Sequence, residues 1–480
     1  MGNVHIVSTQ QNKMEQKKSV FNSSSTVFLA IYNREKDLDT EISLLNHFIL
    51  KRDITDVIAT FELRSLSGEL VKKFDVSMDK KKVYAFRLGD YLDTSFLGTV
   101  YLFFNSKENL AIPFCAVMFS IKTLKSVCGL HTYGRRLEQK ELGSFIDLPE
   151  TIETGWTVKD SASIKSFAVL HGGEFEQNLN VRIECMNDLG NIIIIKKDLT
   201  LASYGTFLLI PQELSRDIVK HLKGRKGHAK VFIKGLKGIF PRMLCGNFLI
   251  DKDNPELLNA KEIQFTHTNF DFSTITQPDS ESNLGYYNQP SLPNGYGIVY
   301  PVNTKKTIFI DNKKYLPNTS HKIGLKSLSQ VEIKSEASNL PSRFVTAAVG
   351  VWNNSLLESE CSTGTFIEDY LKVPCHWHWG LLKPGLETGY SEISIIVNTF
   401  GEDLKTSRNI KLKIFDEEKI LVDTSINIDR NKKINSNDLL GAEVSSGALW
   451  YVFIGDKLED LNIFSTFYPS NKAGFVEHAF

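Results

Sequence analysis

Three histidines occur at matching places in the chain, each near the end of a stretch rich in β-forming residues. His131 stands in the run Cys-Gly-Leu-His-Thr-Tyr, His267 in Gln-Phe-Thr-His-Thr-Asn-Phe, and His478 in Val-Glu-His-Ala-Phe. An aromatic residue follows each of them within two or three positions. Imidazole is a common ligand of Zn²⁺, Fe²⁺ and Cu²⁺, and catalytic sites with three protein ligands keep a position open for water or substrate. The three histidines are therefore candidate ligands of one metal ion.

This metal hypothesis requires three similar modules to pack around one axis, because equivalent residues then converge on that axis. A metal-bound imidazole usually donates its second ring N–H to an oxygen acceptor such as a carboxylate. Asp271 and Glu477 are the carboxylates close in sequence that could play this part. The alternative needs no metal. Each histidine is then a packing residue that a duplicated domain inherits, and duplication alone explains its recurrence.

A second pair of histidines lies in the run Pro-Cys-His376-Trp-His378-Trp. Residues two apart in a strand point to the same face, so both imidazoles could reach one ion. Glu358 and Glu360 have the same spacing nearby. The alternative is an edge strand that turns two histidines to solvent and two tryptophans inward.

A set of aromatic residues between positions 286 and 379 forms the third candidate site. Aromatic faces stack on the apolar faces of sugar rings and on peptides, and the loops of β-sandwiches often carry such sites. The alternative is that these rings fill an interface between this segment and the modules. The candidate ligand-binding residues, with the histidine pair included, are Tyr286, Tyr287, Tyr296, Trp352, His376, Trp377 and His378, and Tyr300 and Trp379 belong to the same aromatic set.

The elements that must position these residues repeat along the chain. Glu153-Thr-Gly-Trp opens one stretch of strand-like segments, and Glu387-Thr-Gly-Tyr opens another. A glycine precedes a late strand in each stretch, and the gaps from Gly98, Gly227 and Gly447 to the next of the three histidines are 33, 40 and 31 residues. Short β-rich runs separated by Gly, Asn and Asp turns are typical of β-sandwiches and barrels.

The sequence therefore predicts an all-β protein. It consists of three homologous Ig-like β-sandwich modules, with an irregular β-rich insertion between the second and the third. Residues 1–24 are polar and are predicted to be a disordered leader. The predicted boundaries are 25–140 for repeat one, 150–273 for repeat two, 274–386 for the aromatic-rich insertion and 387–480 for repeat three.

The composition restricts the class of protein. Of the 480 residues, 42% are hydrophobic and 23% are charged, and the formal net charge is +0. These values are ordinary for a soluble folded chain, and they give no general attraction to nucleic acid or to an anionic membrane. No apolar run reaches the roughly 18 residues of a membrane span, and the leader lacks the apolar core of a secretory signal. Six cysteines without a Cys-x-x-Cys pair indicate free thiols in a reducing compartment, so we expect a cytoplasmic location.

Two functional hypotheses follow, because no nucleotide-binding loop and no nucleophile elbow occurs in the sequence. The first is a non-enzymatic interaction protein that binds a glycan or a protein partner. It is based on the neutral charge, the repetition and the lack of a catalytic motif. The second is a mononuclear metal-dependent enzyme that takes one His ligand from each of three pseudo-symmetric repeats, with one Zn, Fe or Cu ion as its cofactor. The sequence leaves the oligomeric state open.

Overall fold

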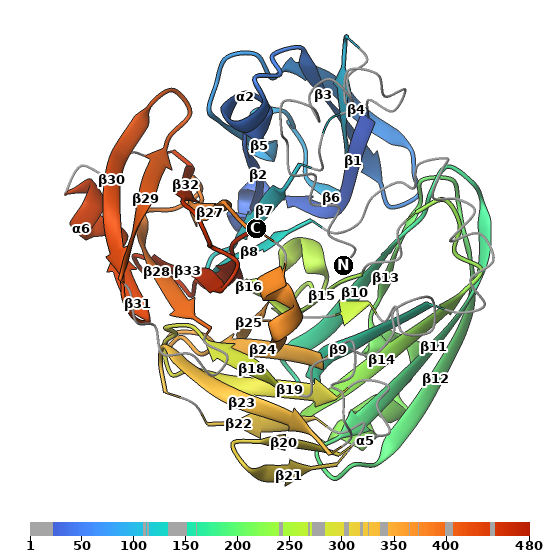
Figure 1. Cartoon of the computed structure of the whole chain (residues 1–480). Helices are drawn as coiled ribbons and strands as arrows, with labels where there is room; N and C mark the ends of the chain where they lie inside the picture. The colour runs from blue at the N-terminus through green and yellow to red at the C-terminus, as the bar shows by residue number, and fades with distance from the viewer. Residues whose placement is uncertain are drawn as a thin grey trace.

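The strands of this protein build a ring of four similar units. The computed structural model describes residues 23–108, 112, 115–132, 151–159, 161–239, 243–266, 269–270, 284–301, 307–316, 320–324, 326–336, 344–363, 365–372, 374–398, 407–441 and 447–480. Most of these residues lie in antiparallel strands, so the prediction of an all-β protein is confirmed. The strands form eight sheets, which pair into four two-sheet units around a central axis (Figure 1).

Each unit is named here by its position along the chain. Unit one contains β1 (Ser23–Tyr32), β2 (Asp39–Leu45), β3 (Val57–Ser65), β4 (Leu70–Ser77), β5 (Val83–Arg87), β6 (Phe96–Ser106), β7 (Val117–Lys122) and β8 (Val127–His131), with the helical segments η1 (Arg34–Lys36), α2 (His47–Arg52) and η2 (Leu88–Asp90). Unit two contains β9 (Thr151–Lys159), β10 (Ile164–His171), β11 (Gln177–Asn187), β12 (Ile192–Leu201), β13 (Thr206–Leu209), β14 (Lys226–Lys234), β15 (Leu244–Leu249), β16 (Glu262–Thr266) and β17 (Asn269–Phe270), with α4 (Pro211–Leu214), α5 (Asp217–Leu222) and η3 (Leu257–Asn259).

The second half of the chain forms the other two units. Unit three contains β18 (Leu284–Gln289), β19 (Tyr296–Pro301), β20 (Ile308–Ile310), β21 (Lys313–Tyr315), β22 (His321–Ile323), β23 (Ser329–Ser335), β24 (Phe344–Gly350), β25 (Ser359–Ser362) and β26 (Thr365–Ile367), with η4 (Glu368–Lys372). Unit four contains β27 (Trp377–Lys383), β28 (Gly389–Val397), β29 (Arg408–Phe415), β30 (Ile420–Ile428), β31 (Lys432–Asn435), β32 (Leu449–Ile454), β33 (Leu461–Pro469) and β34 (Phe475–His478), with α6 (Ser436–Leu440). Within the described ranges, no helix has the length and apolar character that crossing a membrane requires.

All four units have the same strand order. Counted from the first strand of each unit, one sheet has the order four-three-six-one and the other has the order five-two-seven-eight. Units two and three add a ninth strand beside the first. An Ig constant domain places its first, second, fourth and fifth strands in one sheet, so the Ig-like form of the modules is not confirmed.

The segment predicted to be an irregular insertion, 274–386, contains the whole of unit three. Its two sheets repeat the strand order of the other units. The end of the same segment supplies β27, which pairs with β32 and is therefore the first strand of unit four. The chain thus contains four units where the sequence pattern indicated three, because unit three has neither the opening motif nor the histidine on which the repeat was recognised.

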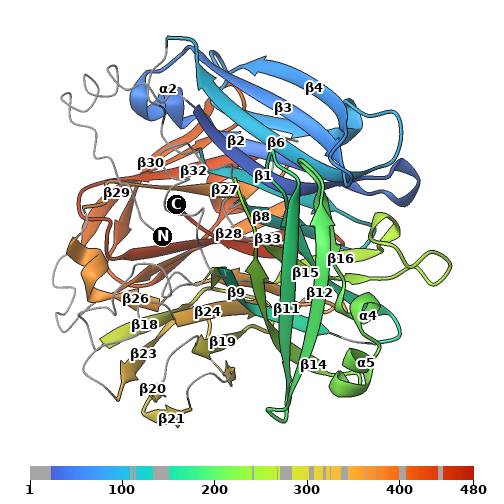
Figure 2. The same cartoon turned by 90° about the vertical axis from the view of Figure 1, so that its right-hand side faces the viewer.

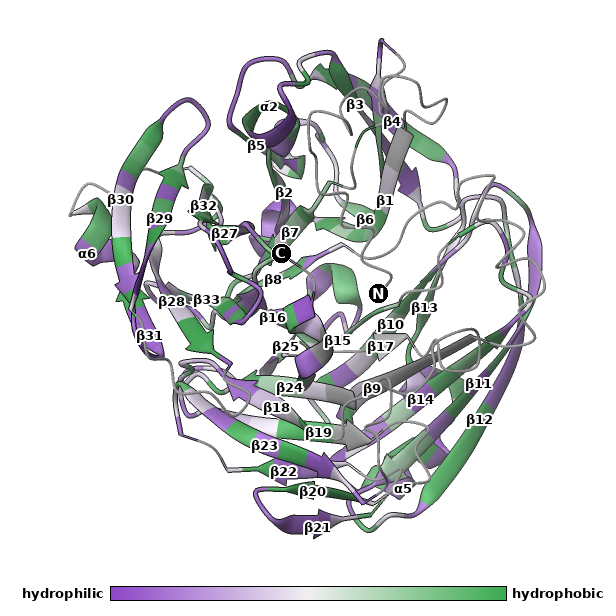
Figure 3. Cartoon of the chain, in the orientation of Figure 1, coloured by the Kyte–Doolittle hydropathy of each residue, from purple (hydrophilic) through white to green (hydrophobic). Residues whose placement is uncertain are grey.

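Alternation along the strands builds the core of each unit. β3 buries every second residue from Val57 to Leu63, and β11 does the same from Leu179 to Cys185. On the outer strand β30, Ile426 and Ile428 are buried and Asn427 between them is exposed. Figure 3 shows hydrophobic and hydrophilic segments mixed along outer strands such as β30. Inner strands such as β7 are buried on both faces, since one face meets the facing sheet and the other meets a neighbouring unit.

The eighth strands β8, β16, β25 and β34 lie at the axis of the ring. Each forms the edge of its sheet and contacts the corresponding strand of both neighbouring units. An open edge carries unpaired N–H and C=O groups, and at the axis side chains of other units satisfy some of them. The Ser126 hydroxyl donates to the carbonyl oxygen of Ile263 at 2.9 Å and accepts from its N–H at 3.1 Å. The Gln264 side chain donates to the carbonyl oxygen of Gly474 at 3.0 Å. Figures 1 and 2 both show unit one between units four and two.

A glycine at the axis gives the first test of this packing. A Cβ atom added to Gly129 of β8 would lie 2.6 Å from the ring of Phe475 of β34, which is itself buried. We expect Gly129→Ala to lower the free energy of unfolding by about 1–3 kcal/mol, because overpacking forces the ring or the backbone to move. Urea denaturation followed by tryptophan fluorescence measures this change.

Gly324→Ala is the matched control for that substitution. An added Cβ atom at Gly324 has no heavy atom within 4 Å, so we expect a change within about 0.5 kcal/mol. Equal denaturation midpoints for the two variants would contradict the packing of units one and four at the axis.

Candidate metal centre

The ends of β8 and β34 bring His131, Glu477 and His478 together at the axis. Oε1 of Glu477 lies 3.0 Å from Nδ1 of His131 and 3.6 Å from Nε2 of His478. The Glu477 carboxylate also accepts hydrogen bonds from the backbone N–H groups of His131, at 3.4 Å, and of His478, at 2.9 Å. One ligand atom from each side chain lies within 4.8 Å of the other two. In the part of the chain that the structure describes, no other trio of His, Cys, Asp or Glu meets this criterion.

Closure of the ring produces this cluster. His131 ends a strand of unit one, Glu477 lies in the last strand of unit four, and the two residues are 346 positions apart in the chain. The ring centres of His131 and His478 lie 4.6 Å apart at an interplanar angle of 73°. The ring of Phe480 stands edge-on to His131 with a centroid distance of 4.9 Å. The last residue of the sequence therefore covers one side of the cluster.

Burial determines the electrostatics of this site. The side chains of His131 and Glu477 are each 4% exposed, and that of His478 is 24% exposed. Burial raises the pKa of Glu477, while the charge of His478 and the two backbone N–H groups oppose this rise. A buried carboxylate is strongly stabilised by a neighbouring positive charge. That charge can be a proton on an imidazole or a metal ion between the three groups.

The three side chains fit a metal ion in chemistry and nearly in distance. Two imidazole nitrogens and one carboxylate oxygen are a donor set that Zn²⁺, Fe²⁺ and Cu²⁺ accept. Metal–ligand bonds of about 2.0–2.2 Å allow two ligands of one ion to lie at most roughly 4.4 Å apart. The observed limit of 4.8 Å is slightly larger, so small rotations of the side chains would bring all three atoms into the coordination sphere.

Two residues of the predicted metal site, His267 and Asp271, lie outside the described residues. β16 ends at Thr266, so His267 follows this axial strand directly, whereas His131 is the last residue of β8. In unit three the corresponding strand β25 ends at Ser362, and Thr363 follows it. Ser-Thr thus stands where unit one has His-Thr. A search that followed histidine alone could not find this fourth counterpart, but the shared threonine could have indicated it.

The second predicted histidine pair does not converge on one point. His376 is exposed, with its Nδ1 3.3 Å from the carbonyl oxygen of Gly455 and 3.5 Å from a carboxylate oxygen of Asp456. Nε2 of His378 instead lies 3.0 Å from the carbonyl oxygen of Leu458. The two imidazoles therefore contact different groups.

The predicted aromatic platform is largely taken up by packing. Tyr287 is 0% exposed, and its hydroxyl donates to the side chain of Gln289 and to the carbonyl oxygen of Ala347. Tyr296 and Trp352 are also buried, at 6% and 7% exposed. Among the predicted ligand-binding aromatics, Tyr286 and Trp377 are half-buried. The faces of the buried rings fill the interior of unit three and its contacts with the neighbouring units.

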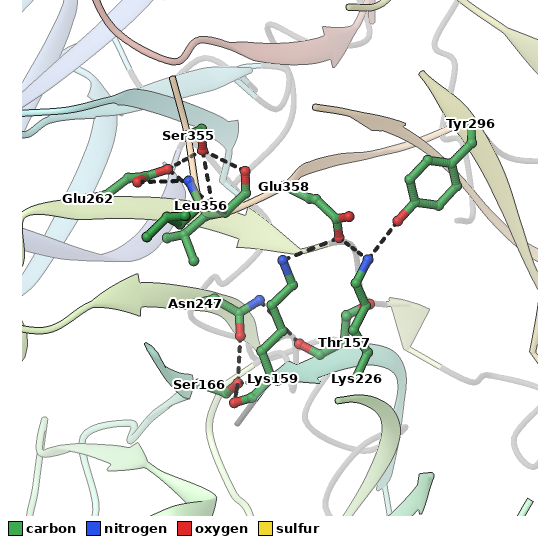
Figure 4. Close-up of polar contacts among 11 residues, drawn as sticks. Thr157, Lys159, Ser166, Lys226, Asn247, Glu262, Tyr296, Ser355, Leu356 and Glu358 are labelled. Carbon is green, nitrogen blue, oxygen red and sulfur yellow. Dashed lines mark hydrogen bonds and ion pairs between the residues drawn. The ribbon is translucent and has the colours of Figure 1, made fainter. Parts of the chain in front are cut away.

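A buried polar network joins units two and three beside the axis (Figure 4). One carboxylate oxygen of Glu358 contacts the ammonium groups of Lys226 and, at 3.3 Å, of Lys159. Lys226 also donates to the hydroxyl of Tyr296 at 2.8 Å. Burial opposes ionisation of Glu358, but the two lysines outweigh it and hold its pKa below the usual value. Sequence spacing gave no signal for this network, since its residues come from distant strands.

A second carboxylate at the same interface holds a loop of unit three against the axial strand of unit two. Glu262 of β16 accepts hydrogen bonds from the Ser355 hydroxyl and from the backbone N–H groups of Leu356 and Leu357 (Figure 4). The loop that precedes β25 is thereby fixed where the two units meet. Glu262 and Glu358 therefore act as bridges between the units.

Comparisons with known proteins give no relative from which a function could be taken. No known protein family matches the chain, and no curated protein matches its sequence. A crystal structure of Streptomyces avermitilis alpha-L-rhamnosidase complexed with L-rhamnose aligns with 7% identity and a TM-score of 0.15, covering 94% of this chain and 55% of that chain. The chain thus spans about half the length of the rhamnosidase. The tetra-tandem repeat in the extending region of a large adhesion protein aligns with 9% identity and a TM-score of 0.10, covering 95% of this chain and 98% of that chain. Similarity this low carries no argument.

The network between units two and three predicts a stability effect. We expect Glu358→Gln to lower the free energy of unfolding at pH 7 by about 2 kcal/mol, because the buried ammonium group of Lys159 and the partly exposed one of Lys226 lose their carboxylate partner. Glu213→Gln removes a surface partner of Lys165 whose side chain is 57% exposed, and this control should cost no more than about 1 kcal/mol.

The same network predicts a pH dependence. The folded-state pKa of Glu358 is depressed below its unfolded-state value. Its ionised carboxylate therefore contributes to the free energy of unfolding above the unfolded-state pKa, and this contribution is lost as the pH falls through the folded-state pKa. The difference between the original chain and Glu358→Gln should therefore shrink below about pH 4. Thermal unfolding from pH 3 to pH 8 measures it. If the difference stays constant over this range, the negative charge of Glu358 does not stabilise the folded chain.

Proposed function

We propose that this protein binds one divalent transition-metal ion at the centre of the ring, through His131, His478 and Glu477. The observation that carries the proposal is the convergence of two imidazoles and one buried carboxylate from opposite ends of the chain. His267 is proposed as a further ligand, because it follows the axial strand of unit two directly. In this proposal Glu477 is a direct ligand of the metal ion. Asp271 remains the proposed acceptor of a hydrogen bond from a metal-bound imidazole.

The donor set supports a catalytic use of the metal ion. Sites with three protein ligands leave a coordination position for water or substrate, and the bound metal supplies Lewis acidity there. His478 is the most exposed of the three ligands, so the open position is proposed to lie on its side of the cluster. The chain itself holds the ion, orients His131 through the carboxylate of Glu477, and keeps water away on the side of Phe480.

We also propose that the four units descend from one duplicated β-sandwich. Their common strand order and the axial position of every eighth strand support this origin. The repetition predicted from three histidines then extends to unit three, where Ser362 occupies the corresponding place. An Ig-like ancestor of these units remains a hypothesis.

The second candidate function is the interaction role predicted from the sequence. Exposed apolar side chains of unit two, Leu189, Ile192 and Ile194, favour a protein partner. A glycan partner would require exposed aromatic faces, and Tyr287, Tyr296 and Trp352 are buried. The partner, like the cytoplasmic location, stays a prediction.

Metal reconstitution tests the proposed function. The full chain is incubated under reducing conditions with Zn²⁺, Fe²⁺ or Cu²⁺, desalted and analysed for bound metal. We expect close to one ion per chain for at least one of these metals. Glu477→Gln and His478→Ala should each weaken binding at least roughly tenfold, because each removes a direct ligand.

His376→Ala is the control, since it removes an exposed histidine that contacts Gly455 and Asp456 and none of the proposed ligands. Its metal content should equal that of the original chain. Thermal unfolding without metal shows whether each variant remains folded. A folded original chain that retains no metal, or a Glu477→Gln variant that retains all of it, would contradict the proposal.

The proposed metal site also predicts a dependence on pH. Metal binding requires neutral imidazoles and an ionised carboxylate, so protons compete with the metal ion. Burial raises the pKa of Glu477, which strengthens the competition between protons and the metal ion at this ligand. Affinity measured by competition with a chelator should therefore fall steadily as the pH is lowered from 7.5 to 5.5. An affinity that does not change over this range would place the metal at other ligands.

A further inference from the structure

A cysteine and a histidine, Cys375 and His378, form a close pair at the start of unit four, and His378 belongs to the second predicted histidine pair described above. Sγ of Cys375 lies 3.6 Å from Nε2 of His378 and 3.4 Å from the carbonyl oxygen of Trp377. Cys375 immediately precedes the region of β27, and the backbone carbonyl oxygen of Cys375 accepts from the N–H of Leu458 at 2.9 Å. The pair is therefore held by the chain on both sides.

The partners of His378 determine which atom carries hydrogen. Nε2 of His378 also lies 3.0 Å from the carbonyl oxygen of Leu458, and a carbonyl oxygen can only accept a hydrogen bond. Nε2 therefore carries a hydrogen, and toward Cys375 it can only donate. The sulfur accepts this hydrogen bond most strongly when it is a thiolate. A protonated thiol can instead donate to the carbonyl oxygen of Trp377. The surroundings thus accommodate both forms of the sulfur.

The charged groups around the pair favour the thiolate on balance. Lys51 of α2 approaches from unit one, with its Nζ 5.3 Å from the ring centre of Trp377. One negative group opposes it, since Glu459 accepts a hydrogen bond from the backbone N–H of Cys375 at 3.3 Å. Burial acts against ionisation of Cys375, but His378 and Lys51 outweigh it and lower the pKa of the thiol.

Cys375 also differs from the other cysteines in access. It is partly exposed, and the other five are buried. Burial raises the pKa of four of these buried thiols, Cys115, Cys128, Cys185 and Cys361. A reactive cysteine needs both a thiolate and an approach for the reagent, and Cys375 combines them.

We propose that Cys375 is a nucleophilic thiolate, paired with the imidazolium of His378, and that it is the site at which small soft electrophiles modify this chain covalently. Alkylating agents are one such class. The two half-buried indoles, Trp377 and Trp379, stand beside Lys51 and form the apolar wall that such a reagent would pass. None of its side chains is among the ligands proposed above for the metal ion, and its link to the metal centre is the pair of backbone hydrogen bonds between Trp379 and Phe480.

Iodoacetamide is the probe that tests the proposal, and its reaction is simple. The sulfur forms a bond to the methylene carbon, the carbon–iodine bond breaks, and iodide leaves with the electron pair. Loss of the thiolate charge removes the partner of the imidazolium, and His378 then releases its proton to water.

The experiment measures the labelling rate of the full native chain from pH 5.5 to 9 in the presence of a metal chelator, and peptide mapping by mass spectrometry locates the label. We expect Cys375 alone to react. At pH 6.5 it should react roughly tenfold faster than free cysteine, because a thiol with a pKa near 8.5 is only about 1% ionised there. His378→Gln should lower the rate at pH 6.5 about tenfold and move the midpoint of the profile toward that of free cysteine.

His376→Gln is the matched control, because it changes the neighbouring exposed histidine and leaves the thiol contact intact. It should keep the profile of the original chain. A profile of the original chain with its midpoint at or above about 8.5 would overturn the proposal, and this measurement needs no variant. Equal profiles for a folded His378→Gln variant and the original chain would overturn the role of His378.

Discussion

The ring depends on contacts among the four eighth strands, each of which forms the edge of a sheet. In each unit the eighth strand has a partner on one side only, and an open edge leaves backbone N–H and C=O groups without partners. β8, β16, β25 and β34 meet at the axis, where side chains such as Ser126 and Gln264 satisfy part of the backbone of another unit. Because each edge is protected by two others, no unit can leave the ring without exposing its neighbours. The ends of these strands consequently bring together residues that are far apart in the chain.

Much of the fold could be predicted from the sequence, because the alternation of buried and exposed residues along strands such as β3 and β11 is a local signal. The turn residues between consecutive strands are local signals as well. The number of units could not. Unit three lacks the motif Glu-Thr-Gly and has Ser362 where a histidine was sought, so only its strand order identifies it. β27 was assigned to the insertion for a related reason. Its alternation of tryptophan and histidine was visible, but its pairing with β32, more than sixty positions later, leaves no local pattern.

The candidate sites, too, could be predicted from the sequence only in part. Recurrence suggested that His131 and His478 would converge, and a closed ring does place them together. The direct contact of Glu477 with both imidazoles, and the bridge from Glu358 to Lys159 and Lys226, result from packing between units and follow no spacing rule. Of the predicted aromatic set, Tyr287 and Trp352 are buried, because large aromatic rings pack in a core as well as they bind ligands on a surface.

We infer that closure of the ring creates a metal site from the first and last units. Anomalous diffraction at the absorption edge of the reconstituted metal tests it most directly. We expect one strong peak at the axis, about 2.0–2.2 Å from a nitrogen of His131, a nitrogen of His478 and an oxygen of Glu477. A peak elsewhere, or a metal-free axis in crystals of a protein shown to be loaded, would contradict it.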